Sequence, residues 1–205
     1  MTTTTDCTTQ VYVYHSLGHQ YSGNKSPDLQ LTLHEYGKDS IELELTNLRY
    51  NTQKWQKIKH ICILATLYLA CITSVPKSLL LSKGLILCGV SCLLWLLYRI
   101  LNLLSLIKSE RIIFCLDLAL QCHTVRIFSR TSNIFIPANN IYDIVINEVI
   151  EDLDVHYILI IRTQGQLFQK RPIIPLFNKL HPSFECLQMT YKYLNKILRK
   201  TGRLS

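Results

Sequence analysis

The densest group of side chains that could perform acid–base chemistry is acidic and lies between positions 143 and 154. Its members are Asp143, Glu148, Glu151, Asp152 and Asp154. Paired carboxylates act as general acid and base only where a cleft shifts the pKa of one of them. On a strand, Asp143 and Glu148 are an odd number of positions apart and would point to opposite faces. The other acids share a turn, where solvated carboxylates are ordinary, so we expect no catalytic residue here.

The chain has eight cysteines, and their spacing does not suggest a metal centre. Four of them lie in apolar runs, where cysteine behaves as a small hydrophobic residue. No second ligand pair accompanies Cys88 and Cys92 at the spacing of a zinc finger. The sequence also lacks a Gly-rich phosphate loop, an HExxH motif and a nucleophile elbow. We therefore expect no metal, no cofactor and no catalysis by this chain alone.

Basic residues without acids gather at the C-terminal end, in a chain of net charge +8. Lys192, Lys196, Arg199 and Lys200 form most of this group. Such a group most simply faces anionic lipid. Nucleic acid is a poor alternative partner, because no binding motif accompanies the charge.

The elements that must hold these residues are mainly strands. Apolar and polar residues alternate over 29–33 and 41–45, around a turn at 36–40. Further β-patterns follow at 111–116, 120–128, 133–137, 141–150 and 155–162. After Pro182, apolar residues recur at helical spacing from Phe184 to Leu198. We expect this stripe to pack on a sheet, although a partner-binding groove is the alternative.

Two apolar runs, 61–75 and 84–98, flank a short polar break. With their flanks they predict a two-helix transmembrane hairpin, about 58–76 and 79–100. Basic residues on both outer flanks predict cytosolic termini and a multi-pass protein. A re-entrant hairpin, or two buried helices of a soluble bundle, remains the alternative.

The expected fold class is an α+β membrane protein. Residues 1–54 would be a cytosolic N-terminal segment with a short β-hairpin, and 55–108 the transmembrane hairpin. Residues 109–205 would form a cytosolic antiparallel sheet capped by a C-terminal helix, with a pleckstrin-homology-like arrangement as one option.

The string Asp143-Ile-Val-Ile-Asn-Glu148, a short turn, a β-run and then Pro175-Leu-Phe177 resemble the signature of the PIG-H family. The helix carrying Leu180, Phe184, Cys186, Leu187 and Tyr191 resembles the closing segment of that family. The resemblance covers roughly 111–198. PIG-H proteins are components of the phosphatidylinositol N-acetylglucosaminyltransferase complex, also called GPI-GlcNAc transferase.

The resemblance implies a component of the endoplasmic reticulum membrane with both termini in the cytosol. The complex transfers N-acetylglucosamine from UDP-N-acetylglucosamine to phosphatidylinositol, the first step of GPI-anchor biosynthesis. Catalysis belongs to PIG-A, and PIG-C, PIG-P, PIG-Q and PIG-Y are further partners. This chain would then be a non-catalytic subunit that binds and positions the catalytic one at the membrane.

The strand around 141–148 is the expected contact with the catalytic subunit. Asp143, Asn147 and Glu148 would supply polar specificity, and Ile144 and Ile146 apolar contact. The alternative is that these residues fill the sheet core and its rim. A different function also fits the pattern: a membrane-anchored pleckstrin-homology-like module that binds phosphoinositides or another protein.

Overall fold

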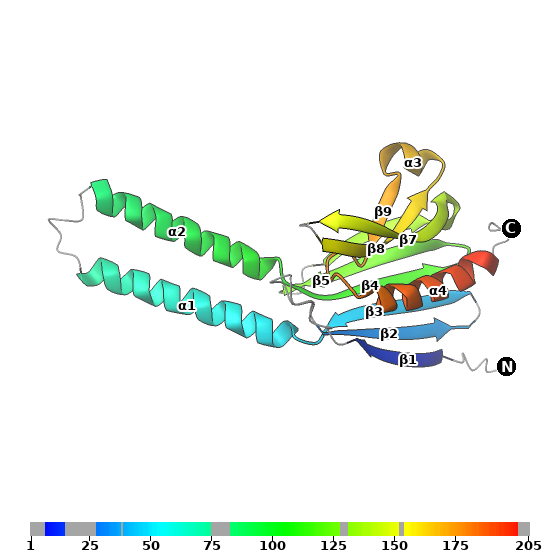
Figure 1. The fold of residues 1–205 in the computed structure, drawn as a ribbon, viewed down its shortest axis with the longest axis horizontal. Coiled ribbons are helices and arrows are strands. Elements are labelled where there is room, and N and C mark those ends of the chain that lie inside the picture. Colours follow the sequence, from blue (N-terminus) through cyan, green and yellow to red (C-terminus); the bar gives the residue numbers. More distant parts are fainter. Residues whose placement is uncertain are drawn as a thin grey trace. The chain divides into compact units, whose positions relative to one another are not determined.

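A computed structural model describes residues 7–14, 28–37, 39–74, 83–127, 131–151 and 154–200 of the chain. Six strands form one antiparallel sheet, in the order in which they occur along the sequence (Figure 1). They are β1 (Cys7–Tyr14), β2 (Leu29–Tyr36), β3 (Ser40–Asn47), β4 (Ile107–Cys115), β5 (Ala119–Arg126) and β6 (Thr131–Pro137).

Strict alternation of apolar and polar residues builds the centre of this sheet. Leu31 pairs with Leu45 and Leu33 with Leu43, and all four side chains are fully buried. Alternation places one face of each strand in the core and leaves the other face to solvent. Gly37, in the turn between β2 and β3, has φ of +68°, a conformation that glycine adopts at little cost.

β3 pairs with β4, although nearly sixty residues separate them in the sequence. The N-terminal strands and the C-terminal part of the chain therefore build one sheet, not two independent segments. Arg111 on β4 supports this pairing, because its guanidinium lies 3.1 Å from Glu42 and 3.2 Å from Glu44 on β3.

A second antiparallel sheet contains β7 (Ile141–Glu151), β8 (Asp154–Thr163) and β9 (Ile173–Leu176). Two short helices accompany it, η2 (Ala138–Asn140) and α3 (Gln166–Lys170). The closing helix α4 (Phe184–Lys200) contacts β3, β7 and β8. Its buried residues join those of both sheets in one hydrophobic core, so α4 packs as expected from its apolar stripe.

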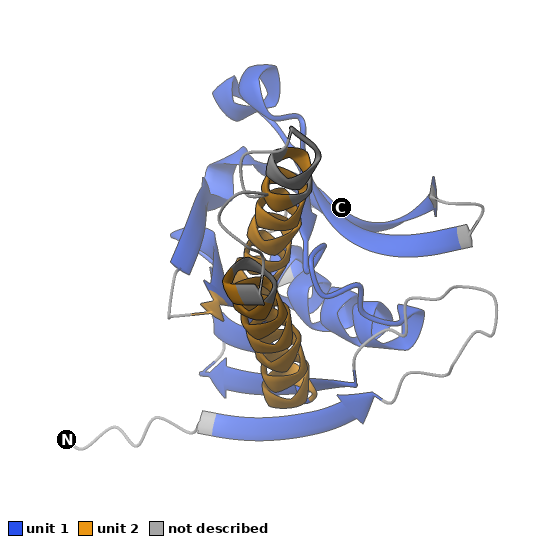
Figure 2. Ribbon diagram, turned by 90° about the vertical axis from the view of Figure 1, so that its left-hand side faces the viewer, with its two compact units in different colours: residues 1–48, 107–125, 129–205 blue, residues 49–106, 126–128 orange. Residues whose placement is uncertain are grey.

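The chain divides into two compact units, coloured separately in Figure 2. The first unit contains both sheets and α4, and comprises residues 1–48, 107–125 and 129–205. The second unit contains the helices α1 (Tyr50–Ser74) and α2 (Lys83–Leu104), which contact each other.

The expected transmembrane hairpin is wrong. Although α1 has 25 residues and α2 has 22, no helix among the described residues is long and apolar enough to cross a membrane. One physical reason is that α1 begins earlier than the apolar run and carries Lys54, Lys57 and Lys59 near its start. The multi-pass topology inferred from the same two runs is therefore also wrong, and so is the multi-pass location in the endoplasmic reticulum membrane expected with it. The fold class is α+β, with two antiparallel sheets instead of one.

Candidate partner-binding surface

Strand β7, which carries the expected contact residues, lies at the edge of its sheet. In the described part of the chain β7 pairs with β8 alone, while β8 also pairs with β9. An edge strand leaves a row of backbone N–H and C=O groups without ladder partners, and such a row can pair with another chain. The register shifts between Ile141 and Asp143, which marks a bulge at the start of the strand.

The structure does not leave Asp143 free for a partner. Both of its carboxylate oxygens accept hydrogen bonds from the Arg162 guanidinium directly across the ladder; that from Nε measures 2.7 Å. Asp143 is 9% exposed, and its hydrogen bond and charge raise the pKa of Arg162. The same guanidinium lies 5.3 Å from the centre of the Tyr142 ring. Asp143 therefore aligns β7 with β8.

The two predicted isoleucines belong to the protein interior. Ile144 is 1% exposed and lies opposite Ile161 across the ladder, in the core shared with α4. Ile146, opposite Leu159, is partly buried and packs against the same core. For these two residues the alternative interpretation, that they fill the sheet core, describes their environment.

Asn147 and Glu148 are the predicted contact residues that the structure leaves exposed. Beyond them the strand continues outward to Ile150, which is 78% exposed and pairs with Val155, which is 49% exposed. Glu148 and Ile150 are two positions apart and share one face of the strand, whereas Asn147 lies on the opposite face. The exposed isoleucine–valine pair and the Glu148 carboxylate therefore combine apolar area with polar selectivity, and the Asn147 amide adds a polar group on the other face. We define the tip surface as Asn147, Glu148, Ile150 and Val155.

Ile150 and Val155 were not among the contact residues expected from the sequence. The signal that could have identified them is the apolar alternation 144, 146 and 150, which runs past the core toward the acidic turn. Exposed apolar residues are informative where they lie next to each other, as Ile150 and Val155 do across the ladder, because contiguous apolar patches mark interaction surfaces.

A second polar group, buried between β4, β5 and the turn after β9, was not expected from the sequence. Glu110 is 7% exposed and its Oε1 lies 3.5 Å from the Thr124 hydroxyl, which lies 3.5 Å from the Lys179 ammonium. Burial raises the pKa of Glu110, opposed by the Lys179 charge and by backbone N–H groups of Lys179 and Leu180. Oε2 of Glu110 is buried without a hydrogen-bond partner among the described residues.

This cluster connects the first sheet to the turn that precedes α4, a turn in which Phe177 and His181 have positive φ. It does not resemble a metal centre, because the described residues contain no group of three or more histidines, cysteines, aspartates or glutamates placed to hold an ion. Burial and the nearby Glu110 also raise the pKa of the Cys122 thiol to about 12, which makes this cysteine a poor nucleophile. The cluster is therefore best understood as structural.

The predicted lipid-facing residues occupy one side of α4. Lys192 and Arg199 are exposed. Lys196 is also exposed, but its ammonium lies 3.4 Å from Glu35 on β2 and 5.9 Å from the centre of the Tyr193 ring. The side chain of Lys200 lies outside the described residues.

Comparison with known proteins gives a match to a protein family. The model of the family described as "PIG-H: GPI-GlcNAc transferase complex, PIG-H component" matches residues 112–178. This segment runs from within β4 to just beyond β9 and contains the whole of β7 and β8, but not α4. No curated protein and no solved structure matches the chain. The resemblance recognised in the sequence is thus confirmed for one segment of the chain: residues 112–178 match the PIG-H family, whose description names a component of the GPI-GlcNAc transferase complex.

Proposed function

We propose that this chain is a non-catalytic subunit that binds and positions the catalytic subunit, PIG-A, within the GPI-GlcNAc transferase complex. The single observation that supports it most is the tip surface at the end of an edge strand inside the matched segment. A partner strand can add to the backbone edge of β7, and the side chains of the tip can select that partner.

The roles of the five predicted residues differ within this proposal. Asp143, Ile144 and Ile146 fix the position of β7, through the ion pair with Arg162 and through the core. Asn147 and Glu148 contact the partner directly, together with Ile150. Because the anchored residues hold β7 in place, the exposed residues that contact the partner are already rigid before binding. This rigidity lowers the entropic cost of binding.

The test is co-purification of the catalytic subunit with a tagged chain from mild detergent. The double substitution Asn147→Lys, Glu148→Lys should reduce recovery of the partner at least tenfold, because like-charged or unpaired groups at an interface cost several kcal/mol. Ile150→Asp should have a similar effect. Undiminished recovery with both variants would exclude the tip surface as the contact.

A matched control uses the same chemical change elsewhere on the first unit. Asn133 on β6 and Asp117 in the turn after β4 are both exposed. Asn133→Lys, Asp117→Lys should leave recovery of the partner unchanged. Far-ultraviolet circular dichroism of both double variants should match the wild type, since exposed substitutions rarely change stability by more than about 0.5 kcal/mol.

The basic side of α4 supports a second proposal, that this surface faces anionic lipid. Lys192, Lys196 and Arg199 follow one another at spacings of four and three residues and so share one side of the helix. Lys192→Gln, Arg199→Gln should lower binding to anionic vesicles about fivefold for each charge removed. Equal binding by the variant and the wild type would leave α4 with a packing role alone.

A further inference from the structure

The helical unit has an unusual charge composition. Residues 49–106 contain no aspartate or glutamate, whereas the same segment contains Arg49, Lys54, Lys57, Lys59, Lys77, Lys83 and Arg99. A segment with cations and no internal anions cannot neutralise its own charge. Its electrostatic complement has to come from acids elsewhere in the chain, from solvent ions or from an anionic ligand.

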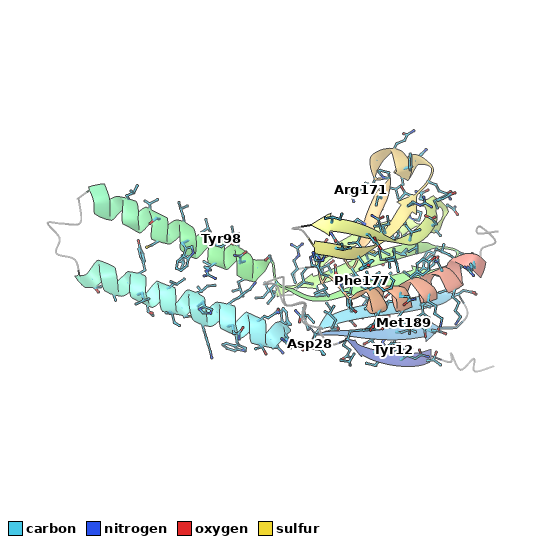
Figure 3. All side chains as sticks on the ribbon, in the orientation of Figure 1. Tyr12, Asp28, Tyr98, Arg171, Phe177 and Met189 are labelled. Atoms are coloured by element: carbon cyan, nitrogen blue, oxygen red, sulfur yellow. The ribbon has the colours of Figure 1, made fainter. Side chains whose placement is uncertain are left out.

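The two helices bury only a narrow stripe against each other. Tyr68 of α1 and Gly89 of α2 lie on this stripe, where a Cβ built on Gly89 would be 3.8 Å from the Tyr68 hydroxyl. The remaining surface carries many exposed apolar side chains; Figure 3 shows the described side chains along both helices, with Tyr98 labelled on α2. The exposed large apolar residues are Trp55, Ile63, Leu67, Leu69, Leu87, Val90, Leu93, Leu94, Trp95, Leu97, Tyr98, Leu101 and Leu104.

A pocket of about 100 Å³ lies between the helices where this apolar surface meets the cations. Lys57 and His60 of α1 and Arg99 and Asn102 of α2 line it. A single water needs roughly 10–15 Å³ of such volume, so the pocket has room for several waters or one compact anion.

The cations of the pocket are already held in position. The Lys57 ammonium donates a 2.8 Å hydrogen bond to the Asn102 carbonyl oxygen, which joins the two helices. The Arg99 guanidinium lies 5.0 Å from the centre of the Trp95 ring. Burial lowers the pKa of Lys57, which means that its charge lacks full solvation and would gain from an anion beside it.

We propose that this pocket binds the phosphate group of an anionic phospholipid, whose acyl chains lie along the exposed apolar surface of α1 and α2. The ligand chemistry is a phosphate joined to an apolar tail: the phosphate contacts Lys57, His60 and Arg99, and the tail covers Trp95 and its apolar neighbours. Binding of a lipid in this way does not require either helix to cross a bilayer, and it is independent of the β7 contact.

Two features favour a lipid over a protein partner. Exposed apolar residues on α2 include the neighbouring pairs 93–94 and 97–98, so they cover more than the single stripe that a partner helix would need. Tryptophan and tyrosine beside lysine and arginine are also the side chains that suit the boundary between lipid headgroups and acyl chains. Free phosphate would satisfy the pocket but would leave the apolar surface in water.

The test is flotation of the full-length chain with phosphatidylcholine vesicles, with and without phosphatidylglycerol. Binding should require the anionic lipid. The loss of two cations that merely lie near an anionic surface should weaken binding about 30-fold, about fivefold for each charge. Lys57→Gln, Arg99→Gln also removes the phosphate contacts of the pocket and should therefore weaken binding by about 150-fold or more. Lys54→Gln, Lys59→Gln removes two charges from the same helix without touching the pocket. The fold loss of vesicle binding for this control should be at least five times smaller than that for the pocket variant. Equal losses for the two variants would refute binding at a defined pocket.

A fluorescent reporter tests where the lipid lies. The chain has two tryptophans, so Trp55→Phe leaves Trp95, four residues from Arg99, as the sole reporter. Vesicles whose acyl chains carry bromine should quench Trp95 emission in this variant. Absence of quenching together with vesicle binding would place the lipid elsewhere, for example on α4, and would overturn the proposal.

Inorganic phosphate distinguishes a lipid from a free anion. Phosphate alone, at the concentration of lipid phosphate in the vesicle experiment, should change Trp95 emission little, because it lacks the apolar tail. A full response to phosphate without vesicle binding would identify a free-anion site instead. If the chain binds no vesicle and the helical unit binds a protein partner instead, the apolar surface is a protein-binding surface. This result would also refute the proposed lipid site. If Lys57→Gln loosens the helix pair, Arg99→Gln and His60→Gln alone still test the pocket.

Discussion

Truncation of one leucine in α4 should destabilise both sheets. Leu194 is completely buried, and the core to which it belongs includes Leu31 and Leu43 of the first sheet and Ile161 of the second. The helix also contacts strands of both sheets, β3 in one and β7 and β8 in the other. If α4 covers one core that both sheets share, the destabilisation caused by the loss of side-chain volume at Leu194 should reach both sheets.

The size of the effect follows from this burial. A buried Leu→Ala substitution costs about 2–5 kcal/mol, more where the surroundings cannot collapse into the cavity. Hydrogen-bonded strands on both sides restrict such collapse, so we expect about 3–4 kcal/mol for Leu194→Ala. Against a total stability of about 5–15 kcal/mol for an ordinary domain, this is a large fraction.

Urea unfolding followed by circular dichroism measures the loss. With a slope of about 2 kcal/mol per molar urea, the midpoint should fall by about 1.5–2 M. Gln188→Ala on the exposed side of the same helix is the control, and should change stability by less than about 0.5 kcal/mol. Amide hydrogen exchange should accelerate in β3 as well as in β7 and β8. A loss below about 1 kcal/mol, or faster exchange in β7 and β8 alone, would refute a core shared through α4.

The burial and backbone conformation of single residues lead to three more expected outcomes. Because burial raises the pKa of Glu110 above its ordinary value of 4.5, its contribution to stability is greatest below pH 4.5 and is lost as the pH rises through the folded-state pKa. Glu110→Gln should therefore gain stability relative to the wild type between pH 4 and pH 7, and a difference that stays constant across this range would contradict the burial argument. Burial raises the pKa of the Cys122 and Cys186 thiols to about 12, whereas Cys62 and Cys92 are exposed. A maleimide at pH 7.5 should therefore modify Cys62 and Cys92 before Cys122 and Cys186, and mass analysis of the peptides measures this order. Gly37→Ala should cost about 1–2 kcal/mol through its positive φ, although its Cβ would meet nothing within 4 Å, and Gly37→Asn should cost less in the same urea titration.

Local patterns in the sequence were sufficient for most strands and for α4. The alternation at 29–33 and 41–45 depends only on which face is buried, and that is visible residue by residue. The N-terminal strand β1 was not among the predicted strands, although Val11, Tyr12 and Val13 favour a strand. The short helix α3, which follows Gly165, was not predicted. One helical turn is too short to produce a recognisable period.

The larger errors concern the domain organisation and the roles of the contact residues. Both depend on contacts between residues far apart in the sequence, which a local pattern does not reveal. Pairing between β3 and β4 connects parts of the chain that the sequence appeared to separate at 55–108. The role of Asp143 also depended on a distant residue. Its carboxylate forms an ion pair with Arg162 and is therefore not available to a partner. Apolar composition alone suggested a membrane span for α1 and α2, whereas the positions of their polar residues define a cationic pocket between them.

The register of β3 against β4 explains how one chain can hold two such different units. Thr46, next to the end of β3, pairs with Ser109, close to the start of β4, so the strand ends that flank α1 and α2 are already neighbours in the sheet. Neighbouring antiparallel strands need only a loop of about two to five residues, and the helical hairpin is therefore an insertion into a sheet that is complete without it. The matched segment 112–178, by contrast, is not complete, because it lacks β3, which pairs with β4, and α4, which covers the core. A chain in which a short loop replaces residues 49–106 should thus keep the sheets and the β7 contact while losing the phosphate pocket. The proposal for the β7 contact and the proposal for the phosphate pocket can therefore be tested, and refuted, separately.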